Sequence, residues 1–257
     1  MILNNRTEIK YCPQRIISLV PSQTSLLHAL GVGDHVIGIT KFCTEPPQWK
    51  KDKCMIGGTK NPNIQLIIKL IPDLIIANKE ENRKEDVELL ALEFPVWVTD
   101  VFDLSSALNM ISDLGTLTQK TIEADLISQQ IQLAFQKLHS IDTSNKIPTA
   151  YLIWKDPWMT IGGDTFINDM MKYAGLKNIF ENETRYPVIQ LDNLKEMGCE
   201  LLLLSSEPYP FSEKHINELA EHLPDCKIIL VDGMKFSWYG DQLLETPDYL
   251  IDLLNKM

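Results

Sequence analysis

The sequence predicts an α/β fold of two lobes, each built around a parallel sheet, with one long helix joining them. Short apolar segments alternate with helical patterns in both halves of the 257-residue chain, and this alternation is typical of parallel sheets. Residues 118–140 contain no proline or glycine and separate the two halves. We therefore expect an N-terminal lobe at 1–117, a linker helix at 118–142 and a C-terminal lobe at 143–257.

The first half shows four apolar segments that we expect to be strands, at residues 15–20, 35–40, 74–77 and 95–99. In parallel α/β units, ligands sit at the carboxyl ends of the strands. Three loops that follow strands should therefore line one rim of a binding cleft. They are Pro21-Ser22-Gln23, Lys41-Phe42-Cys43 and Asn78-Lys79-Glu80.

The segment between the halves has apolar residues at helical spacing, namely Ile127, Ile131, Ala134, Phe135 and Leu138. About 23 residues at a rise of ~1.5 Å give a rod of roughly 35 Å, which is enough to cross a domain. A packing helix inside one large domain remains an alternative. The similar α/β patterns on both sides favour the linker.

The second half has expected strands at 150–154, 201–205 and 227–231, and aromatic residues gather where two of them end. Trp154 and Trp158 lie at and just after the end of the strand expected at 150–154. The strand expected at 227–231 is followed by Phe236, Trp238 and Tyr239. Aromatic side chains in loops offer flat apolar area to a large planar ligand. Packing of the loops against the core is the alternative for each of them.

A short motif occurs twice, as Ile56-Gly57-Gly58-Thr59 and as Ile161-Gly162-Gly163-Asp164. Neither copy has the G-x-G-x-x-G or G-K-[ST] spacing of a phosphate-binding loop. The motif therefore favours tight-turn geometry over a phosphate cradle.

The composition argues against several classes of partner. The chain has 24 basic and 35 acidic side chains, for a net charge of −11, whereas nucleic-acid binding needs a basic surface. The same charge argues weakly against an anionic membrane. No apolar run approaches the ~20 residues of a membrane helix, so we expect no membrane insertion.

No pattern of catalytic or metal-binding residues stands out. None of the five histidines pairs with another ligand-type residue at i, i+4 in a credible metal frame, and no G-x-S-x-G, H-E-x-x-H or kinase signature occurs. We therefore assign no catalytic residue and no protein-only metal site. The five cysteines form no C-x-x-C pair, and their odd number suggests reduced thiols. Cys43 lies in a rim loop, where a soft metal ligand or a nucleophile is the alternative to packing.

The first fifteen residues, MILNNRTEIKYCPQR, are polar and lack the apolar core of a secretory signal. A cytoplasmic location is expected if Met1 is the native start.

Three segments in this order resemble the helical-backbone (class III) periplasmic substrate-binding proteins of ABC importers, and within them the cobalamin-binding subgroup. They are RIISLVPSQTSLLHALG at 15–31, the run 56–83, and YLIWKDPWMTIGGDTFINDMMKYAGLKNIF at 151–180. The resemblance covers almost the whole chain. It implies a ligand cleft between two lobes, little hinge motion, a periplasmic location, and a cargo of cobalamin, iron-siderophore or haem.

The resemblance also assigns ligand-binding positions. Phe42 and Trp154 match wall aromatics of the two lobes, and the loop 236–240 matches the last contact loop. Lys60 and Asn78 stand where cobalamin binders place tryptophans, which suggests a more polar ligand or a different corrinoid orientation. Other residues are expected at the site because of their positions in loops. Together with the positions assigned by the resemblance, the expected ligand-binding set is Phe42, Lys60, Asn78, Lys79, Trp154, Trp158, Phe236, Trp238 and Tyr239.

Docking to a permease depends on one glutamate per lobe in the importer-bound members of this family. The matching positions here are Gln65 and Asp192, which leaves docking to an ABC permease open.

The sequence thus predicts a monomeric, non-enzymatic substrate-binding protein of an ABC-type importer. Its expected ligand is a large metal chelate, a cobalamin or other corrinoid or an iron-siderophore, and it has no intrinsic cofactor. Two alternatives are a cytoplasmic corrinoid or tetrapyrrole chaperone, and a chelatase-like enzyme. The enzyme would need convergent titratable groups in the cleft.

Overall fold

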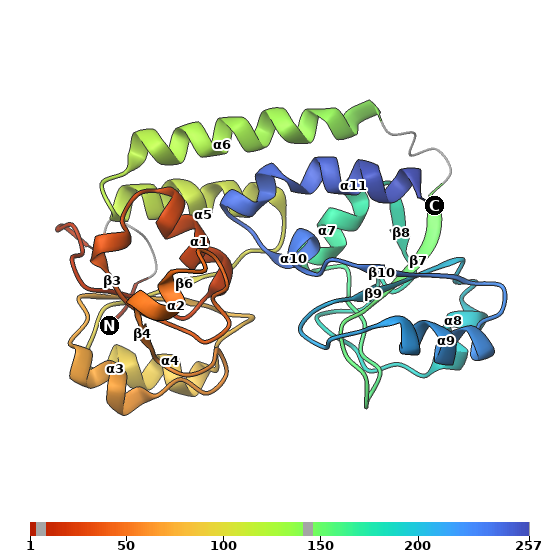
Figure 1. Cartoon of the computed structure of the whole chain (residues 1–257), viewed down its shortest axis with the longest axis horizontal. Helices are drawn as coiled ribbons and strands as arrows, with labels where there is room; N and C mark the ends of the chain where they lie inside the picture. The colour runs from red at the N-terminus through yellow and green to blue at the C-terminus, as the bar shows by residue number, and fades with distance from the viewer. Residues whose placement is uncertain (4–8, 141–145, 257) are drawn as a thin grey trace. The chain divides into compact units, whose positions relative to one another are not determined.

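The computed structural model describes residues 1–3, 9–140 and 146–256, which form two units with one parallel sheet each (Figure 1). Unit 1 comprises Met1–Val101, Ser105–Gln132 and Tyr239–Leu244. Unit 2 comprises Phe102–Leu104, Leu133–Trp238 and Glu245–Met257. The predicted α/β class with a parallel sheet in each half is confirmed.

The sheet of unit 1 has six strands in the order β1-β6-β5-β2-β3-β4, and every neighbouring pair is parallel. The strands are β1 (Ile2–Leu3), β2 (Ile16–Ser18), β3 (Val36–Ile39), β4 (Cys54–Met55), β5 (Leu74–Asn78) and β6 (Val96–Thr99). The four strands expected from the sequence are β2, β3, β5 and β6. The two-residue strands β1 and β4 are too short to give a hydrophobic pattern.

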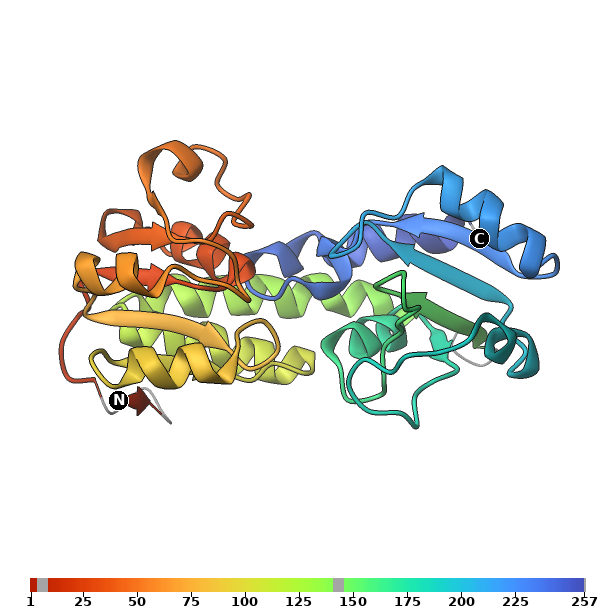
Figure 2. The ribbon, with the colours of Figure 1, turned by 90° about the horizontal axis from the view of Figure 1, so that it is seen from below.

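Helices cover both faces of this sheet. They are α1 (Pro21–Ala29), η2 (Gly33–His35), α2 (Trp49–Asp52), α3 (Ile64–Leu70), α4 (Lys84–Ala91) and α5 (Leu104–Leu117). Ile67 of α3 and Leu90 of α4 pack with Ile17 and Ile75 of the sheet in one buried cluster. Figures 1 and 2 show α3 and α4 on one face of the sheet, and Figure 1 shows α5 on the other.

The sheet of unit 2 has four parallel strands in the order β10-β9-β7-β8. They are β7 (Ile147–Leu152), β8 (Leu176–Asn178), β9 (Leu201–Ser205) and β10 (Lys227–Val231). The remaining helices are α7 (Phe166–Tyr173), α8 (Leu191–Glu196), α9 (Glu213–His222), α10 (Met234–Ser237), η4 (Asp241–Leu244), which belongs to unit 1, and α11 (Thr246–Asn255). Leu194 of α8 and Leu219 of α9 pack with Leu202 and Leu204 in the core of unit 2.

The long helix predicted at 118–142 is shorter in the structure. It is α6 (Thr121–Gln136), followed by the 3-10 turn η3 (Lys137–Ser140). Residues 118–120 belong to a tight α5–α6 turn, in which Gln119 has a φ of 59° and the Lys120 amide donates to the Gly115 carbonyl. The predicted end at 142 lies outside the described residues, and the lobe boundaries stay a prediction.

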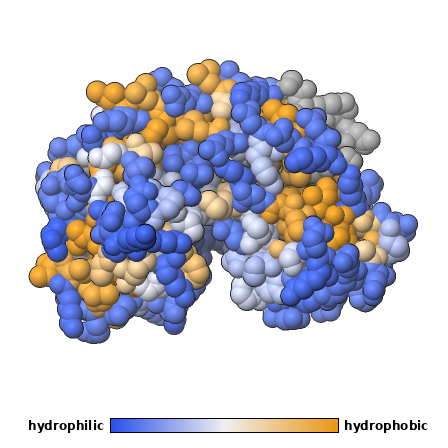
Figure 3. All heavy atoms as spheres, viewed as in Figure 1, coloured by the Kyte–Doolittle hydropathy of each residue, from blue (hydrophilic) through white to orange (hydrophobic). Residues whose placement is uncertain are grey.

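Helix α6 also carries exposed apolar side chains. Ile122, Leu126 and Leu133 are more than half exposed, and orange spheres lie along the upper edge of the view in Figure 3. No helix in the described ranges is long and apolar enough to cross a membrane.

The repeated double-glycine motif makes close backbone contacts in both copies. Gly57 has a φ of 100°, and a Cβ there would lie 2.8 Å from the Asn61 carbonyl oxygen. A Cβ at Gly163 would lie 2.0 Å from the carbonyl oxygen of Glu181, and the Gly163 amide donates to the Glu183 carbonyl. Since chain segments occupy the space beside these glycines, the contacts favour turn geometry over a phosphate cradle.

Candidate functional site

The parallel sheet of unit 1 brings the carboxyl ends of its strands to one edge, which we call the unit 1 rim. It comprises the start of α1 and the loops 40–43, 57–62, 78–82 and 99–101. Hydrogen bonds tie these segments together. The Lys41 amide donates to the Gly57 carbonyl, and the Lys79 amide donates to the Thr99 carbonyl. The rim is therefore one connected surface, as the sequence predicted for three of its loops.

Helix α1 starts at the rim with buried polar side chains. Gln23 Nε2 donates to Thr99 Oγ1 at 2.6 Å, and Thr24 Oγ1 lies 3.1 Å from Cys43 Sγ. Ser22 Oγ and Gln23 Oε1 are buried and have no hydrogen-bond partner among the described residues. Burial raises the pKa of Cys43 and hydrogen bonds from Thr24 and Thr40 oppose it, so the thiol is protonated near neutral pH.

Phe42 presents a flat apolar surface at the rim. Its side chain is 51% exposed. The ring lies over Gly58, where a Cβ would approach it to 3.2 Å, and Lys41 Nζ is 5.0 Å from its centroid. Phe42 is therefore an exposed aromatic residue of the rim, and its contact with a ligand stays a prediction.

Asn78 is a correction to the expected ligand-binding set. It is only 1% exposed, and its side chain is used inside unit 1. Asn78 Nδ2 donates to Thr99 Oγ1 at 3.1 Å, and Asn78 Oδ1 accepts from the Glu80 amide at 2.8 Å. The amide therefore shapes the rim loop and has no exposed edge for a ligand.

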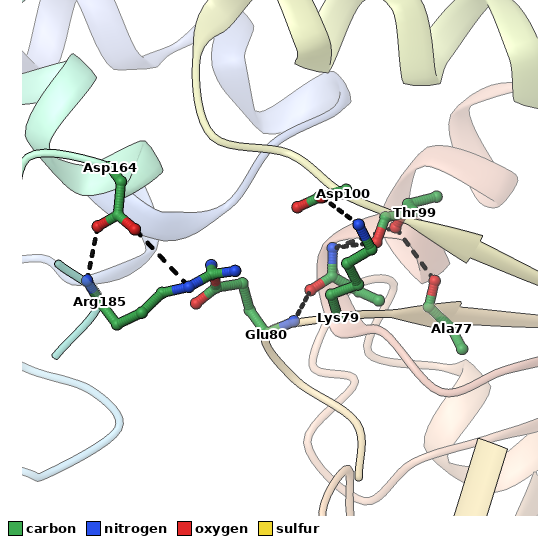
Figure 4. A network of polar contacts seen from close by, with 8 residues as sticks. Ala77, Lys79, Glu80, Thr99, Asp100, Asp164 and Arg185 are labelled. Carbon is green, nitrogen blue, oxygen red and sulfur yellow. Dashed lines mark hydrogen bonds and ion pairs between the residues drawn. The ribbon is translucent and has the colours of Figure 1, made fainter. Parts of the chain in front are cut away.

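Two further lysines of the rim, Lys60 and Lys79, remain exposed but have partners. Lys79 Nζ lies 2.5 Å from Asp100 Oδ2, and Figure 4 shows this ion pair beside Thr99. Lys60 Nζ donates to the Glu80 carbonyl, which ties loop 57–62 to loop 78–82. Burial lowers the pKa of Lys60, against the attraction of Glu81.

The carboxyl ends of β7, β9 and β10 define a corresponding unit 2 rim. Trp154, just after β7, is 40% exposed, and its ring meets that of Tyr209 edge-on at 5.6 Å between centroids. Tyr209 in turn packs on Phe211 at 4.7 Å, and Trp158 stacks on Phe211 at 6.2 Å. We call Trp154, Trp158, Tyr209 and Phe211 the aromatic cluster.

Charged groups border this aromatic cluster. Lys155 Nζ lies 5.3 Å from the Trp158 ring and forms an ion pair with Glu218 of α9. The hydrogen bond to Glu218 raises the pKa of Lys155. His215 is buried under Tyr209 and Phe211, and its Nδ1 accepts from the Ser212 amide at 3.0 Å. Desolvation lowers the pKa of His215.

The loop after β10 differs from the expectation. Phe236 is fully buried between Tyr151 and Tyr249, at centroid distances of 5.2 and 6.3 Å. It is a core residue of unit 2, and we remove it from the ligand-binding set. Trp238 is 6% exposed, and its Nε1 donates to Glu207 Oε1 at 2.9 Å.

Tyr239 of the same loop belongs to unit 1. It is 5% exposed, and its hydroxyl donates to Glu81 Oε1 of the rim at 3.4 Å. Trp238 and Tyr239 thus present little surface, and they hold rim carboxylates in place.

The sequence analysis missed Glu207 and Tyr209. Burial raises the pKa of Glu207, and hydrogen bonds from Trp238 and Ser237 oppose the shift. Both residues lie in Glu207-Pro208-Tyr209-Pro210-Phe211, shortly after the strand expected at 201–205. We expected the loops at the carboxyl ends of the other strands to form the site. The same rule, applied to the strand at 201–205, identifies Glu207 and Tyr209.

The second glycine motif ends at Asp164, which anchors the segment around Arg185. Asp164 Oδ1 accepts from the Arg185 amide at 2.6 Å, and the guanidinium lies 3.7 Å from Oδ2, as Figure 4 shows. The two residues at the expected docking positions are both exposed. Gln65 lies on α3, and Asp192 lies on α8 with Lys195 3.9 Å away.

No group of three or more His, Cys, Asp or Glu side chains that could hold a metal ion occurs among the residues described. The arrangement offers aromatic rings and hydrogen-bonding groups at two sheet edges. That chemistry suits recognition of a ligand.

Comparison with known proteins extends this result. A curated relative, the vitamin B12-binding protein of Pectobacterium atrosepticum, is 26% identical over 255 residues, which is 95% of this chain and 90% of the relative. Two solved structures show the same fold. The periplasmic vitamin B12-binding protein of Vibrio cholerae gives a TM-score of 0.78 at 20% identity, covering 95% of this chain and 97% of that one. The periplasmic haem-binding protein of the same organism gives 0.79 at 17% identity, covering 94% and 98%.

The sequence model of one family matches most of the chain. Its description is periplasmic binding protein, and the match covers residues 16–224, including both sheets except β1 and β10. The chain therefore belongs to the periplasmic binding protein family.

Proposed function

We propose that this protein is the substrate-binding component of an ABC-type importer and binds a large metal chelate. A cobalamin or other corrinoid is the first candidate, and an iron-siderophore or haem is the second. The observation that carries the proposal is the similarity to a vitamin B12-binding protein along 95% of the chain. The family consists of substrate-binding proteins, which does not favour the chelatase alternative.

The rims supply the chemistry that such a ligand requires. Phe42 and Trp154 are both close to half exposed at carboxyl edges of the sheets. Flat conjugated ligands gain apolar contact and favourable ring geometry on such side chains. The ammonium groups of Lys41, Lys60 and Lys79 suit carboxylates, amides or phosphates at the edge of a ligand. The ligand brings its own metal, so the protein needs no resident cofactor.

It stays a prediction that residues of both rims contact the same ligand molecule. If Phe42 and Trp154 contact the same ligand molecule, each single substitution will weaken binding. The double substitution will then remove the ligand-induced stabilisation. If only one of them contacts the ligand, the other substitution will leave binding unchanged.

A thermal-shift screen tests the proposal. The wild-type protein is heated with cyanocobalamin, haemin, and ferric hydroxamate and catecholate siderophores, each up to about a millimolar. At least one should raise the midpoint, because a ligand that binds only the native state stabilises it. No shift with any of these ligands would contradict the proposed cargo. Leu92→Ala is the control for the substitutions of Phe42 and Trp154, because Leu92 is 80% exposed and follows α4, away from the rim.

Transport is the second part of the proposal. We infer that the protein acts outside the cytoplasmic membrane and delivers its ligand to an ABC permease. Gln65 and Asp192 are exposed at the positions where docking glutamates are expected. Growth on the identified ligand as a limiting nutrient, with the gene deleted and restored, tests this role. Unchanged uptake in the deletion strain would contradict it.

A further inference from the structure

Two cysteines of unit 2 lie next to each other although they are 27 positions apart in the sequence. Cys199 precedes β9, and Cys226 directly precedes β10. These strands are parallel neighbours with Lys227 opposite Leu201, so both cysteines lie at the amino edge of the sheet. Their sulfur atoms are 3.8 Å apart.

The backbone around both cysteines is held by hydrogen bonds. The Cys199 amide donates to the Leu194 carbonyl, and the Cys226 amide donates to the Leu223 carbonyl. A further bond joins the two connections directly, because the Lys227 amide donates to the Glu200 carbonyl at 2.9 Å. The two side chains are therefore kept in register with each other.

The distance is short enough for a covalent bond. A disulfide has a sulfur–sulfur distance of about 2.05 Å, so the sulfur atoms must approach by roughly 1.8 Å. Each Cys side chain has one rotatable bond before its sulfur, and small rotations of both can supply this movement. Both side chains are only partly buried, so an oxidant can reach them.

The other three thiols have different surroundings. Cys43 is buried beside Thr24 and Thr40, and Cys12 lies 3.6 Å from the Thr118 carbonyl oxygen. Cys54 is in β4 of unit 1. In the described part of the chain, no other pair of thiols lies within hydrogen-bonding distance.

We propose that Cys199 and Cys226 form an intramolecular disulfide when the protein meets a disulfide oxidant, such as an oxidised protein dithiol or oxidised glutathione. Sequence analysis suggested only reduced thiols, because linear spacing does not show which strands are neighbours. The inference is independent of the ligand.

The reaction is thiol–disulfide exchange in two steps. The Cys199 thiolate attacks one sulfur of the oxidant, whose disulfide bond breaks, and the released thiolate takes up the proton that Cys199 lost. Cys226 then loses its proton and attacks the Cys199 sulfur of the mixed disulfide. The second oxidant thiolate leaves and takes that proton. Two cysteine thiols are oxidised, and one oxidant disulfide is reduced to two thiols.

The contact between the sulfur atoms suits this order of steps. The Cys226 thiol donates to Cys199 Sγ and thereby lowers the pKa of Cys199. The same contact raises the pKa of Cys226. The neighbouring thiol thus stabilises a thiolate at this pair by its hydrogen bond, and the thiolate is the reactive form.

The closed loop would contain residues 199–226, which include β9, the rim segment with Tyr209, and α9. A disulfide restricts the unfolded chain and so stabilises the folded unit. Because the bond lies at the amino edge of the sheet, opposite the rim, we expect oxidation to stabilise unit 2 without changing ligand binding.

Intact mass and thiol counting test the proposal. Reduced protein is incubated with oxidised glutathione, unfolded in acid and labelled with a maleimide. The proposal predicts the loss of two hydrogen atoms and three labelled thiols in place of five. A tryptic digest without reductant should link peptides 196–214 and 215–227. Oxidation should also raise the thermal midpoint by several degrees.

Single variants identify the pair. Cys199→Ser and Cys226→Ser should each stop at a glutathione adduct or stay reduced, and neither should gain thermal stability on oxidation. Cys12→Ser and Cys54→Ser are matched controls and should still lose two hydrogen atoms. Five labelled thiols after oxidation, a stable glutathione adduct in the wild type, or a linked peptide from any other pair would overturn the proposal.

Discussion

Trp154 and Phe42 are both substantially exposed, Trp154 against another aromatic side chain and Phe42 beside a glycine. Trp154 rests on Tyr209, whose other contacts are Phe211 and His215, and Phe42 rests on Gly58. Exposed aromatic surface with rigid support is what a ligand wall needs, because little side-chain freedom is lost on binding.

Replacing Trp154 with alanine should weaken ligand binding about tenfold or more, since an aromatic contact contributes roughly 0.5–1.5 kcal/mol beyond its buried area. Stability should change little because the ring is 40% exposed. Fluorescence or calorimetric titration of the variant measures the dissociation constant. Leu92→Ala is the control, and an equal loss in both variants would count against a specific role for Trp154.

Glu207 gives a pH-dependent prediction. Burial raises its pKa in the folded protein, so the folded state holds this proton more tightly than the unfolded chain. Stability therefore falls as the pH rises from the ordinary pKa of glutamate through the raised folded value. Glu207→Gln removes this titration and keeps an oxygen that can accept from Trp238. The variant should gain stability relative to wild type as the pH rises, and little difference should remain in acid.

Urea unfolding of both proteins between about pH 4 and pH 8 measures this difference in the free energy of unfolding. Glu200→Gln is the control, because residue 200 is exposed. If the difference between Glu207→Gln and wild type does not vary with pH, burial does not perturb this carboxyl group.

At the scale of elements, the sequence predicted strands whose apolar run is continuous. The segments expected at 201–205 and 227–231 coincide with β9 and β10. β1, β4 and β8 have two or three residues each, too few for a periodic signal, and their pairing depends on the neighbouring strand. The helical pattern continues from α6 into the 3-10 turn η3, which is why the sequence does not separate the two.

The candidate site was predictable to a different degree. The positions of the expected strands along the sequence identified the residues at and after their carboxyl ends. These residues include Phe42 and Trp154. It could not show that Asn78 is enclosed by Thr99 and the Glu80 amide, or that Phe236 packs between two tyrosines. Burial of a loop residue depends on contacts distant in sequence, which a single sequence does not reveal.

Asn63 caps helix α3 directly after the rim loop 57–62. Its Oδ1 accepts from the Leu66 amide at 3.0 Å. Asn63→Ala should lower the free energy of unfolding by about 1 kcal/mol, because an amide at the helix start loses its partner. Chemical denaturation measures the change. Gln65→Ala, an exposed substitution in the same helix, should stay within about 0.5 kcal/mol of wild type, and equal effects in the two variants would argue against the cap.

At the scale of the molecule, each unit has a parallel sheet with loops at the carboxyl ends of its strands, and the family match spans most of both units. A ligand that binds only the folded protein adds RT ln(1 + [L]/Kd) to its stability, which is ~2.7 kcal/mol at a hundredfold excess over Kd. The thermal midpoint should therefore rise with ligand concentration, and a midpoint that does not depend on ligand concentration would contradict specific binding.

The central claim is that the protein binds a large metal chelate, and isothermal titration calorimetry tests it most directly. Purified protein is titrated separately with cyanocobalamin, haemin and a ferric siderophore. The account predicts saturable binding of at least one of them, with a weaker dissociation constant for Trp154→Ala and an unchanged one for Leu92→Ala. Absence of saturable heat with all three ligands would contradict it, whereas equal affinity in wild type and Trp154→Ala would contradict only the assignment of Trp154 to the ligand site.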